Sequence, residues 1–305
     1  MRVIDRQQYL NITKPTKKFG TKGSDKGQLK YPFGVSIDSH GEIYVSEFLN
    51  QRVQVFNQQG SALRSFGQKP EGTLVNPCGI VVDKYDNVVV ADTHQHCIQI
   101  FSTKGNHVLS VGYFGKGDAQ FNHPRYICQH FNGNFYITDS RNDRISVFDE
   151  NWNFIHHFGS QGSQKGMLDS PRGIAVDSSG RVVVSEYNSH RIQIFDSEGR
   201  FIQEFGCEGK ADGKFKYPQG MCVDQNDNII VADQLNNRLQ IFDNQGNFIH
   251  KITDLEFPAC VNVAPDGSLI VAHSNEVLIY DNKGRYSYDS LRKLFRTIRK
   301  KSFQL

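Results

Sequence analysis

Residues that could contact a nucleic acid gather at two positions of a pattern that recurs along this 305-residue chain. One position flanks a proline, and the other is a short segment further along each copy. Tyr, Phe, Arg, His and Asn occupy both positions, and they differ from copy to copy. Aromatic and guanidinium planes can stack on bases, while Asn, His and Arg can hydrogen-bond base edges or phosphates. The pattern therefore favours recognition of single-stranded RNA.

The candidate RNA-binding residues share these two positions or lie directly beside them. They are Tyr31, Phe33, Phe48, Asn50, His94, His123, Arg125, Tyr126, Arg141, Asn142, Arg172, Tyr187, Asn188, Lys216, Tyr217, Asn236 and Phe257. Any single aromatic residue beside a proline could equally fill a junction between repeats. Arg125, Arg141 and Arg172 together favour ligand binding more strongly than packing.

The recurring proline sets the architecture. It stands at Pro32, Pro77, Pro124, Pro171, Pro218 and Pro258, which gives steps of 45, 47, 47, 47 and 40 residues. Each copy divides into four short strands, for example "GIAVD" (173–177), "VVVSE" (182–186), "RIQIF" (191–195) and "RFIQEFG" (200–206). Such a period with four strands per unit is typical of a propeller blade. We expect an all-β, six-bladed β-propeller over residues 27–284.

The sixth copy has no counterpart of its fourth strand. Instead "KPTKKFG" (14–20), within an N-terminal segment of residues 1–26, aligns with "RFIQEFG". We expect this strand to complete the last blade, because that closes the ring and removes an exposed sheet edge.

An acidic residue at the end of the second strand and an arginine at the start of the third recur in register. The acids are Glu47, Asp92, Asp139, Glu186 and Asp233, and the arginines are Arg52, Arg144, Arg191 and Arg238. Recurrence within the repeat favours structural ion pairs over ligand contacts. These residues are therefore left out of the candidate site.

Four segments carry a family resemblance. "VADTHQHCIQIF", "TDSRNDRISVF", "SEYNSHRIQIF" and "VADQLNNRLQIF" resemble the NHL repeat, over about residues 14–284. The loop "EFGCEGKADGKFKYP" (204–218) is similar to the C-terminal propellers of the tripartite-motif/NHL family and of Brat-type translational repressors. The resemblance implies an RNA-binding face for single-stranded or stem-loop RNA, action on messenger untranslated regions, and protein partners in a repressor complex. The sequence lacks RING and B-box modules, so ubiquitin-ligase activity is not assigned to this chain.

Charge is distributed unevenly. The net charge is +3, yet residues 1–26 carry +5 and residues 285–305 carry +6, which leaves about −8 on the propeller. RNA binding must then rely on a local basic patch rather than on overall charge. Residues 289–305 predict a basic amphipathic helix. This helix could be a packed extension, an RNA-binding arm, or a contact for a partner or a membrane surface.

Hydropathy and cysteine content limit the class of protein. Mean hydropathy is −0.50, no apolar run approaches the roughly 20 residues of a membrane helix, and the N-terminus lacks an apolar signal core. We expect a cytoplasmic, monomeric protein without membrane contact, or a piece of a longer protein. Six cysteines without a Cys-x-x-Cys pair predict reduced thiols, although three disulfides remain an alternative.

Two other functions compete with RNA binding. An enzyme would need a metal cluster at the channel mouth, for which His94, His123, His130 and His273 are candidates, but no spacing fixes their convergence. No cofactor motif is apparent, so none is expected. A protein-interaction platform, for a ubiquitin ligase or a repressor complex, is the stronger rival because aromatic residues and Arg also form protein hot spots.

Overall fold

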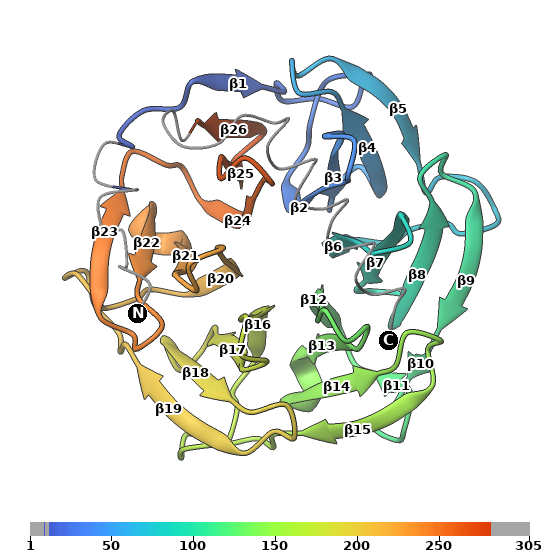
Figure 1. Cartoon of the computed structure of the whole chain (residues 1–305). Helices are drawn as coiled ribbons and strands as arrows, with labels where there is room; N and C mark the ends of the chain where they lie inside the picture. Colours follow the sequence, from blue (N-terminus) through green and yellow to red (C-terminus); the bar gives the residue numbers. More distant parts are fainter. Residues whose placement is uncertain (1–8, 10–11, 282–305) are drawn as a thin grey trace, which may run out of the picture.

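The computed structural model describes residue 9 and residues 12–281, which form six four-stranded antiparallel sheets arranged around a central axis (Figure 1). Each sheet corresponds to one proline repeat, so the predicted all-β six-bladed propeller is confirmed. The predicted C-terminal helix lies outside the described residues.

The first two strands of every blade form the interior. The first strands, which begin at the recurring proline and surround the axis, are β2 (Pro32–Ile37), β6 (Pro77–Val82), β12 (Pro124–Gln129), β16 (Pro171–Val176), β20 (Pro218–Val223) and β24 (Pro258–Val263). The second strands are β3 (Ile43–Glu47), β7 (Asn87–Asp92), β13 (Phe135–Asp139), β17 (Val182–Glu186), β21 (Ile229–Asp233) and β25 (Leu269–His273). The second strands are rich in Val and Ile because neighbouring blades cover both of their faces.

The third strands are β4 (Arg52–Phe56), β8 (Cys97–Ser102), β14 (Arg144–Phe148), β18 (Arg191–Phe195), β22 (Arg238–Phe242) and β26 (Glu276–Tyr280). The outer strands are β5 (Ala62–Phe66), β9 (His107–Val111), β15 (Phe154–Phe158), β19 (Phe201–Phe205), β23 (Phe248–Ile252) and β1 (Lys17–Phe19). Polar–apolar alternation suggests that the third strand is half-buried, but β4, β14, β18 and β22 are buried throughout. Their Arg and Gln side chains bond to the loops above them, which satisfies polar groups inside the blade.

The N-terminal strand closes the ring. β1 pairs antiparallel with β26, with Lys17 opposite Ile279 and Phe19 opposite Val277, and the two lie side by side in Figure 1. Tyr9 adds a second attachment that the sequence did not predict. Its ring is buried, and its hydroxyl donates a 2.7 Å hydrogen bond to Asp224 of blade 5.

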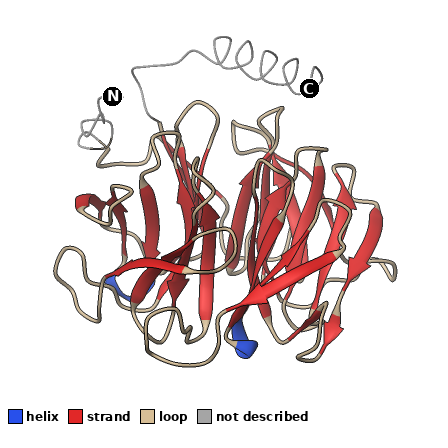
Figure 2. Ribbon diagram, turned by 60° about the horizontal axis from the view of Figure 1, so that its bottom comes forward, coloured by secondary structure: helices blue, strands red, loops and turns tan. Residues whose placement is uncertain are grey.

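The propeller has two distinct faces. We call the loop face the one that holds the residues preceding each proline and the loops between second and third strands; the opposite turn face holds the tight turns. The short strands β10 (Tyr113–Phe114) and β11 (Gln120–Phe121) and the 3-10 helices η2 (Ser140–Asn142) and η3 (Gln234–Asn236) belong to loop-face connections. Both helices, blue in Figure 2, lie on the same side of the disk.

The predicted structural ion pairs are present in four blades. Nε of Arg52, Arg144, Arg191 and Arg238 lies 2.5–2.9 Å from the carboxylates of Glu47, Asp139, Glu186 and Asp233. Each guanidinium also donates to carbonyls of the loop that enters its blade, as Arg144 does to Lys116 and Gln120. Blade 2 differs, because Cys97 pairs in register with Asp92 where the arginine would stand.

All six cysteines are free thiols, as expected from their spacing. Cys78, Cys97, Cys222 and Cys260 are buried. Burial raises the pKa of the Cys97 thiol to about 12 and that of Cys260 to about 11. Cys97 and Cys260 therefore pack as small apolar groups rather than react as thiolates.

Candidate functional site

The residue just before each recurring proline lies at the loop face. Tyr31, Asn76, His123, Ser170, Tyr217 and Phe257 all have left-handed backbone conformations, with φ between 47° and 57°. In two blades the N–H of this residue donates to a histidine of the preceding blade: His123 to Nδ1 of His96 at 3.1 Å, and Tyr217 to Nδ1 of His190 at 3.0 Å. These contacts link neighbouring blades at the loop face.

Aromatic rings form a continuous arc over blades 1 to 3. The ring of Phe48 lies 6.1 Å from Tyr31, 5.8 Å from Phe33 and 6.0 Å from His94. The arc continues from His94 to His123 at 5.2 Å. Tyr31 is 42% exposed and His94 is exposed, so the arc presents open ring surfaces.

The arc extends toward the rim through residues that the sequence analysis did not select. The ring of His96 lies 4.6 Å from His123 and 4.9 Å from Phe114. Tyr113 and Phe114 are each 63% exposed. His96 directly precedes the third strand of its blade, and His190 holds the same position in blade 4. This repeated histidine is the feature of the sequence that could have identified His96 as a candidate. Nothing local in the sequence indicates that Phe114 meets His96.

A second aromatic group lies over blades 4 and 5. The rings of Tyr187 and Tyr217 are 4.5 Å apart, and His190 lies 4.6 Å from Tyr217. The guanidinium of Arg172 lies 4.5 Å from the centre of the Tyr187 ring. Two of the predicted aromatic residues are thus joined to a predicted arginine.

Arg125 connects the first arc to the channel. Its guanidinium lies 5.7 Å from the Phe33 ring and 5.9 Å from the Phe48 ring, and Nη1 donates to the sulfur of Cys78 at 3.2 Å. Nε of Arg125 and Nε of Arg172 are both buried without a hydrogen-bond partner. Burial, followed by the charge of Arg125, lowers the pKa of Arg172 to about 10. Each of the two guanidinium groups therefore keeps a buried Nε–H donor without a partner.

We call Arg125, Arg141, Arg172, His94 and His123 the arginine–histidine surface. Within residues 12–281, no ion pair involves these three arginines. Burial, and then the charge of Arg141, lowers the pKa of His123 to about 4; burial, and then the charge of Arg125, also lowers the pKa of His94. The surface is thus short of negative charge, and an anion placed there would relieve repulsion among its cations.

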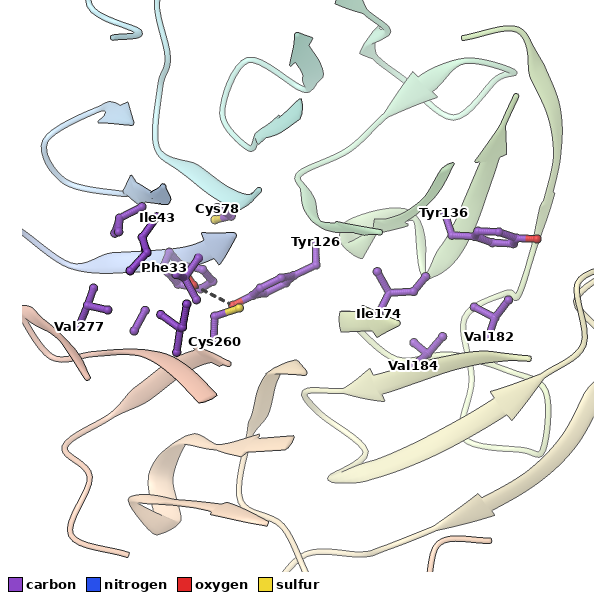
Figure 3. Close-up of a cluster of buried hydrophobic side chains, with 14 of the residues drawn as sticks. Phe33, Ile43, Cys78, Tyr126, Tyr136, Ile174, Val182, Val184, Cys260 and Val277 are labelled. Atoms are coloured by element: carbon purple, nitrogen blue, oxygen red, sulfur yellow. Dashed lines mark hydrogen bonds between the residues drawn. The ribbon is translucent and has the colours of Figure 1, made fainter. Parts of the chain in front are cut away.

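Tyr126 requires a correction. It was expected on the binding surface, but its side chain is only 5% exposed and crosses the axial channel. Its hydroxyl donates to the carbonyls of Phe33 at 3.2 Å and Ala259 at 2.7 Å, in blades 1 and 6, and Figure 3 shows the ring pointing toward Phe33 and Cys260. Blades 1, 2, 4 and 5 have glycine at this position and blade 6 has Cys260, so only blade 3 places a ring there. Phe33, at 4% exposure, likewise lies beneath the surface.

Three predicted asparagines have structural roles. Nδ2 of Asn50, Asn142 and Asn236 donates to the carbonyls of Gly23, Gly115 and Gly209, and each also bonds to the acid of its blade's ion pair. Asn188 is exposed and donates to Asp169.

Lys216 is half-buried, and its backbone N–H donates to Asp233. Phe257 is 47% exposed in blade 6, and its N–H donates to Asn237. No ring or charge contact among the described residues joins either of them to the arginine–histidine surface.

Of the four histidines considered for a metal site, only His94 and His123 have rings that neighbour each other. His130 follows β12 at the turn face, with both ring nitrogens buried and unpartnered, and His273 lies 3.6 Å from Glu276 in blade 6. Across the described part of the chain, no group of three or more His, Cys, Asp or Glu side chains could hold a metal ion. The described residues also contain no helix long and apolar enough to cross a membrane.

Sequence comparisons identify the repeat. The model of the NHL repeat matches residues 74–101, 168–195 and 215–242, within blades 2, 4 and 5. The chain is 42% identical over 55 residues to the E3 ubiquitin-protein ligase TRIM71 of Rattus norvegicus, a match that covers 18% of this chain and 6% of that protein. It is 38% identical over 58 residues to Protein wech of Drosophila melanogaster, covering 19% and 7%. For Protein lin-41 of Caenorhabditis elegans, the identity is 38% over 47 residues, covering 15% and 4%.

Solved structures share the fold at low identity. A gluconolactonase from Xanthomonas campestris superposes with a TM-score of 0.66 at 14% identity, covering 88% of this chain and 97% of that one. Virginiamycin B lyase from Staphylococcus aureus superposes with a TM-score of 0.61 at 13% identity, covering 88% and 89%. At such identity the likeness concerns the propeller fold alone.

Proposed function

We propose that this propeller, which carries NHL repeats, binds single-stranded or stem-loop RNA on its loop face and acts as the recognition domain of a post-transcriptional regulator of messenger RNA. The arginine–histidine surface is the observation that carries the proposal. Three arginines without carboxylate partners lie on the same face as exposed rings such as Tyr31, which combines donors for phosphates with platforms for bases. The activity is binding without chemistry, in the cytoplasm, together with protein partners of a repressor complex.

The compensation of many acidic side chains supports this proposal. Acidic side chains such as Asp38, Asp83, Asp177 and Asp224 close the turns of the opposite face, where they accept hydrogen bonds from nearby backbone N–H groups. The ion-pair acids at the loop face are already neutralised by arginine in four blades. A propeller with net negative charge can therefore still present a local cationic surface.

Selection of a randomised RNA library on the purified chain, at two salt concentrations, tests the function. We expect one short motif to be enriched, and the enrichment to survive the higher salt because rings and amides contact bases. Affinity should still fall with salt by about 0.7 log units per phosphate contact per decade. The absence of any enriched motif, or binding that disappears entirely at higher salt, would reject base recognition.

Substitutions test the chosen face. Arg125→Ala, Arg172→Ala and Tyr217→Ala should each weaken binding of the selected RNA about tenfold in a fluorescence anisotropy titration, because each removes a charged donor or a stacking ring. Arg200→Ala is the matched control, since Arg200 lies at the turn face with its side chain 76% exposed. If the first three variants bind like the control, RNA does not bind to this face.

A protein-interaction platform is the alternative function. It is favoured by Tyr113 and Phe114, which are each 63% exposed at the rim of the loop face, because exposed aromatic residues are enriched at protein interfaces. A partner bound there would lose affinity on Phe114→Ala, whereas the steep salt dependence of phosphate contacts would be absent.

A further inference from the structure

A cavity of about 450 Å³ opens on the loop face between blades 1 and 2. Its walls include Lys30, Leu49, Asn50, Gln68 and Thr73. Its volume falls within the range of roughly 300–1,000 Å³ typical of small-molecule sites. Asn50 is the one lining residue that is also a candidate RNA-binding residue from the sequence.

The cavity lies against a loop that is shorter than its counterparts. In blade 1 the loop that enters the blade runs from Gly20 to Leu29, which are nine positions apart in the sequence. The equivalent two residues are also nine positions apart in blades 3, 4 and 5. In blade 2 the corresponding pair is Gly67 and Leu74, which is two residues closer. The correspondence is structural: a Cβ on Gly20 or Gly67 would meet the Leu29 or Leu74 side chain.

The short loop also lacks the arginine that holds the others. Arg52 donates to the carbonyls of Ser24, Asp25 and Gln28 in the blade 1 loop. Cys97 takes the corresponding place in blade 2, and a thiol cannot bond several carbonyls at once. Blade 2 thus departs from the repeat in loop length and in loop support, next to the cavity.

The cavity adjoins the aromatic arc directly. Phe48 and Leu49 donate from their backbone N–H groups to the carbonyls of Tyr31 and Lys30, at 3.1 and 3.4 Å. Lys30 and Leu49 line the cavity, while Tyr31 and Phe48 belong to the arc. A strand of RNA stacked on Tyr31 would therefore bring its next base to the cavity.

The lining offers groups that suit a base edge. Nε2 of Gln68 donates to the carbonyl of Asn50 at 3.3 Å, which leaves Oε1 of Gln68 able to accept. Gln51, also in the lining, is exposed and supplies a second amide. The exposed ammonium of Lys30 is placed to contact a phosphate. Amides that donate and accept are the groups that read Watson–Crick edges of unstacked bases.

We infer that this cavity holds one unstacked nucleobase of the bound RNA and fixes its identity. The inference rests on the proposed function, because it places one nucleotide of the same ligand. Gln68 and Gln51 contact the base edge, Lys30 contacts the adjoining phosphate, and Tyr31 stacks on the neighbouring base.

A substitution that fills the cavity tests which base of the RNA occupies it. The RNA motif selected by the wild-type chain is bound to Gln68→Trp, and single abasic nucleotides are then placed at each position of the motif. We expect Gln68→Trp to weaken binding of the intact RNA about tenfold, because the contacts of one base with the cavity are lost. We also expect that removal of the base at one position of the motif weakens RNA binding by the wild type but does not change RNA binding by the variant.

Ser160→Trp is the matched control. Ser160 follows Gly159 as Gln68 follows Gly67, it is exposed, and it lies at the longer loop of blade 4. This variant should bind like the wild type. Gln68→Ala, which removes the amide without filling the cavity, should relax the preference for one base, and thermal melts establish that each variant is folded.

The outcomes separate the two proposals. If the wild type enriches no RNA motif, the proposed function fails. If it enriches a motif, but Gln68→Trp loses affinity equally for every abasic RNA or binds the intact RNA unchanged, the cavity holds no base while the function stands. Unchanged base preference in Gln68→Ala would also overturn the assignment of that residue.

Discussion

At the residue scale, His94 and His123 are arranged to take up a proton when an anion binds. Nδ1 of each ring lies against an asparagine oxygen, Asn76 for His94 and Asn122 for His123. These bonds assign the proton to Nδ1 and leave Nε2 available. His96 differs, because its Nδ1 accepts the backbone N–H of His123. His94 and His123 are therefore the histidines that can respond to a phosphate.

We predict that RNA binding strengthens as the pH falls from 8 to 6. In the free protein the pKa of His123 is lowered to about 4, and that of His94 is also lowered. A bound phosphate opposes the arginine charges and raises both pKa values, so binding takes up protons below the pKa of the complex. We expect the dissociation constant, measured by fluorescence anisotropy, to fall about three- to tenfold.

The double variant His94→Asn, His123→Asn should bind RNA with an affinity independent of pH over this range. The pH range of the binding experiment ends at 6 because the folded protein loses stability at lower pH. A lowered histidine pKa contributes stability above about pH 6.5, and this stability is lost as the pH falls toward 4. Equal pH dependence in the double variant and the wild type would contradict proton uptake by these rings.

At the element scale, the stability of blades 1 to 5 depends on how the buried carboxylate at the end of the second strand is compensated. In blade 3, Asp139 pairs with Arg144 at 2.9 Å. In blade 2, Asp92 has no arginine; its carboxylate accepts from the backbone of Val75 at 2.9 Å and from Gln99 at 3.5 Å. Burial dominates over these hydrogen bonds and raises the pKa of Asp92 to about 7.

We predict that Asp92 makes folding less stable as the pH rises. Its folded-state pKa lies above its unfolded value of about 3.9. The stabilisation is therefore complete below pH 4 and is lost as the pH rises through about 7. Relative to Asp92→Asn, the wild type should lose about 2 kcal/mol of unfolding free energy between pH 5 and pH 8, as measured by urea denaturation.

Asp139→Asn is the contrasting variant. It leaves the guanidinium of Arg144 buried without its carboxylate, so it should cost about 3 kcal/mol at pH 8. Burial raises the pKa of Asp139 as well, but the hydrogen bond and the charge of Arg144 oppose that rise. A wild type and an Asp92→Asn variant with parallel pH profiles would show that Asp92 is ionised throughout the range.

At the scale of the whole molecule, contacts between residues far apart in sequence hold the ring together. β1 joins the two ends of the propeller through β26. The ring of Phe19 lies 4.8 Å from that of Phe56, in the next blade. Tyr126 links blades 1, 3 and 6 through the channel.

We predict that deleting residues 1–20 destabilises the whole propeller. The deletion exposes the edge of β26 and removes the Phe19–Phe56 contact. We expect the melting temperature to fall by at least about 5 °C. Lys18→Ala removes only a 70% exposed side chain 3.8 Å from Glu276 and should melt like the wild type. An unchanged melting temperature after the deletion would show that β1 does not seal the ring.

The sequence by itself determined the architecture, because six blades that tile a ring must repeat their strand and turn residues. Pro171 at the start of a strand and the Glu186–Arg191 pair at a strand connection follow from local register alone. The candidate face was also predictable in outline, since residues beside each proline share one end of a blade. Asn142 and Asn236 were misjudged because their partners, the loop carbonyls, lie 27 residues away.

Only the tertiary structure decided which face residues are accessible and which meet. Tyr126 reaches carbonyls 93 and 133 residues distant, and closure of the ring sets those contacts. The pairing of Phe114 with His96 and the cavity beside Gln68 depend equally on how neighbouring blades and loops of different length are placed. Local periodicity encodes each blade, whereas the proposed binding surface arises between blades, where sequence separation carries no information about distance.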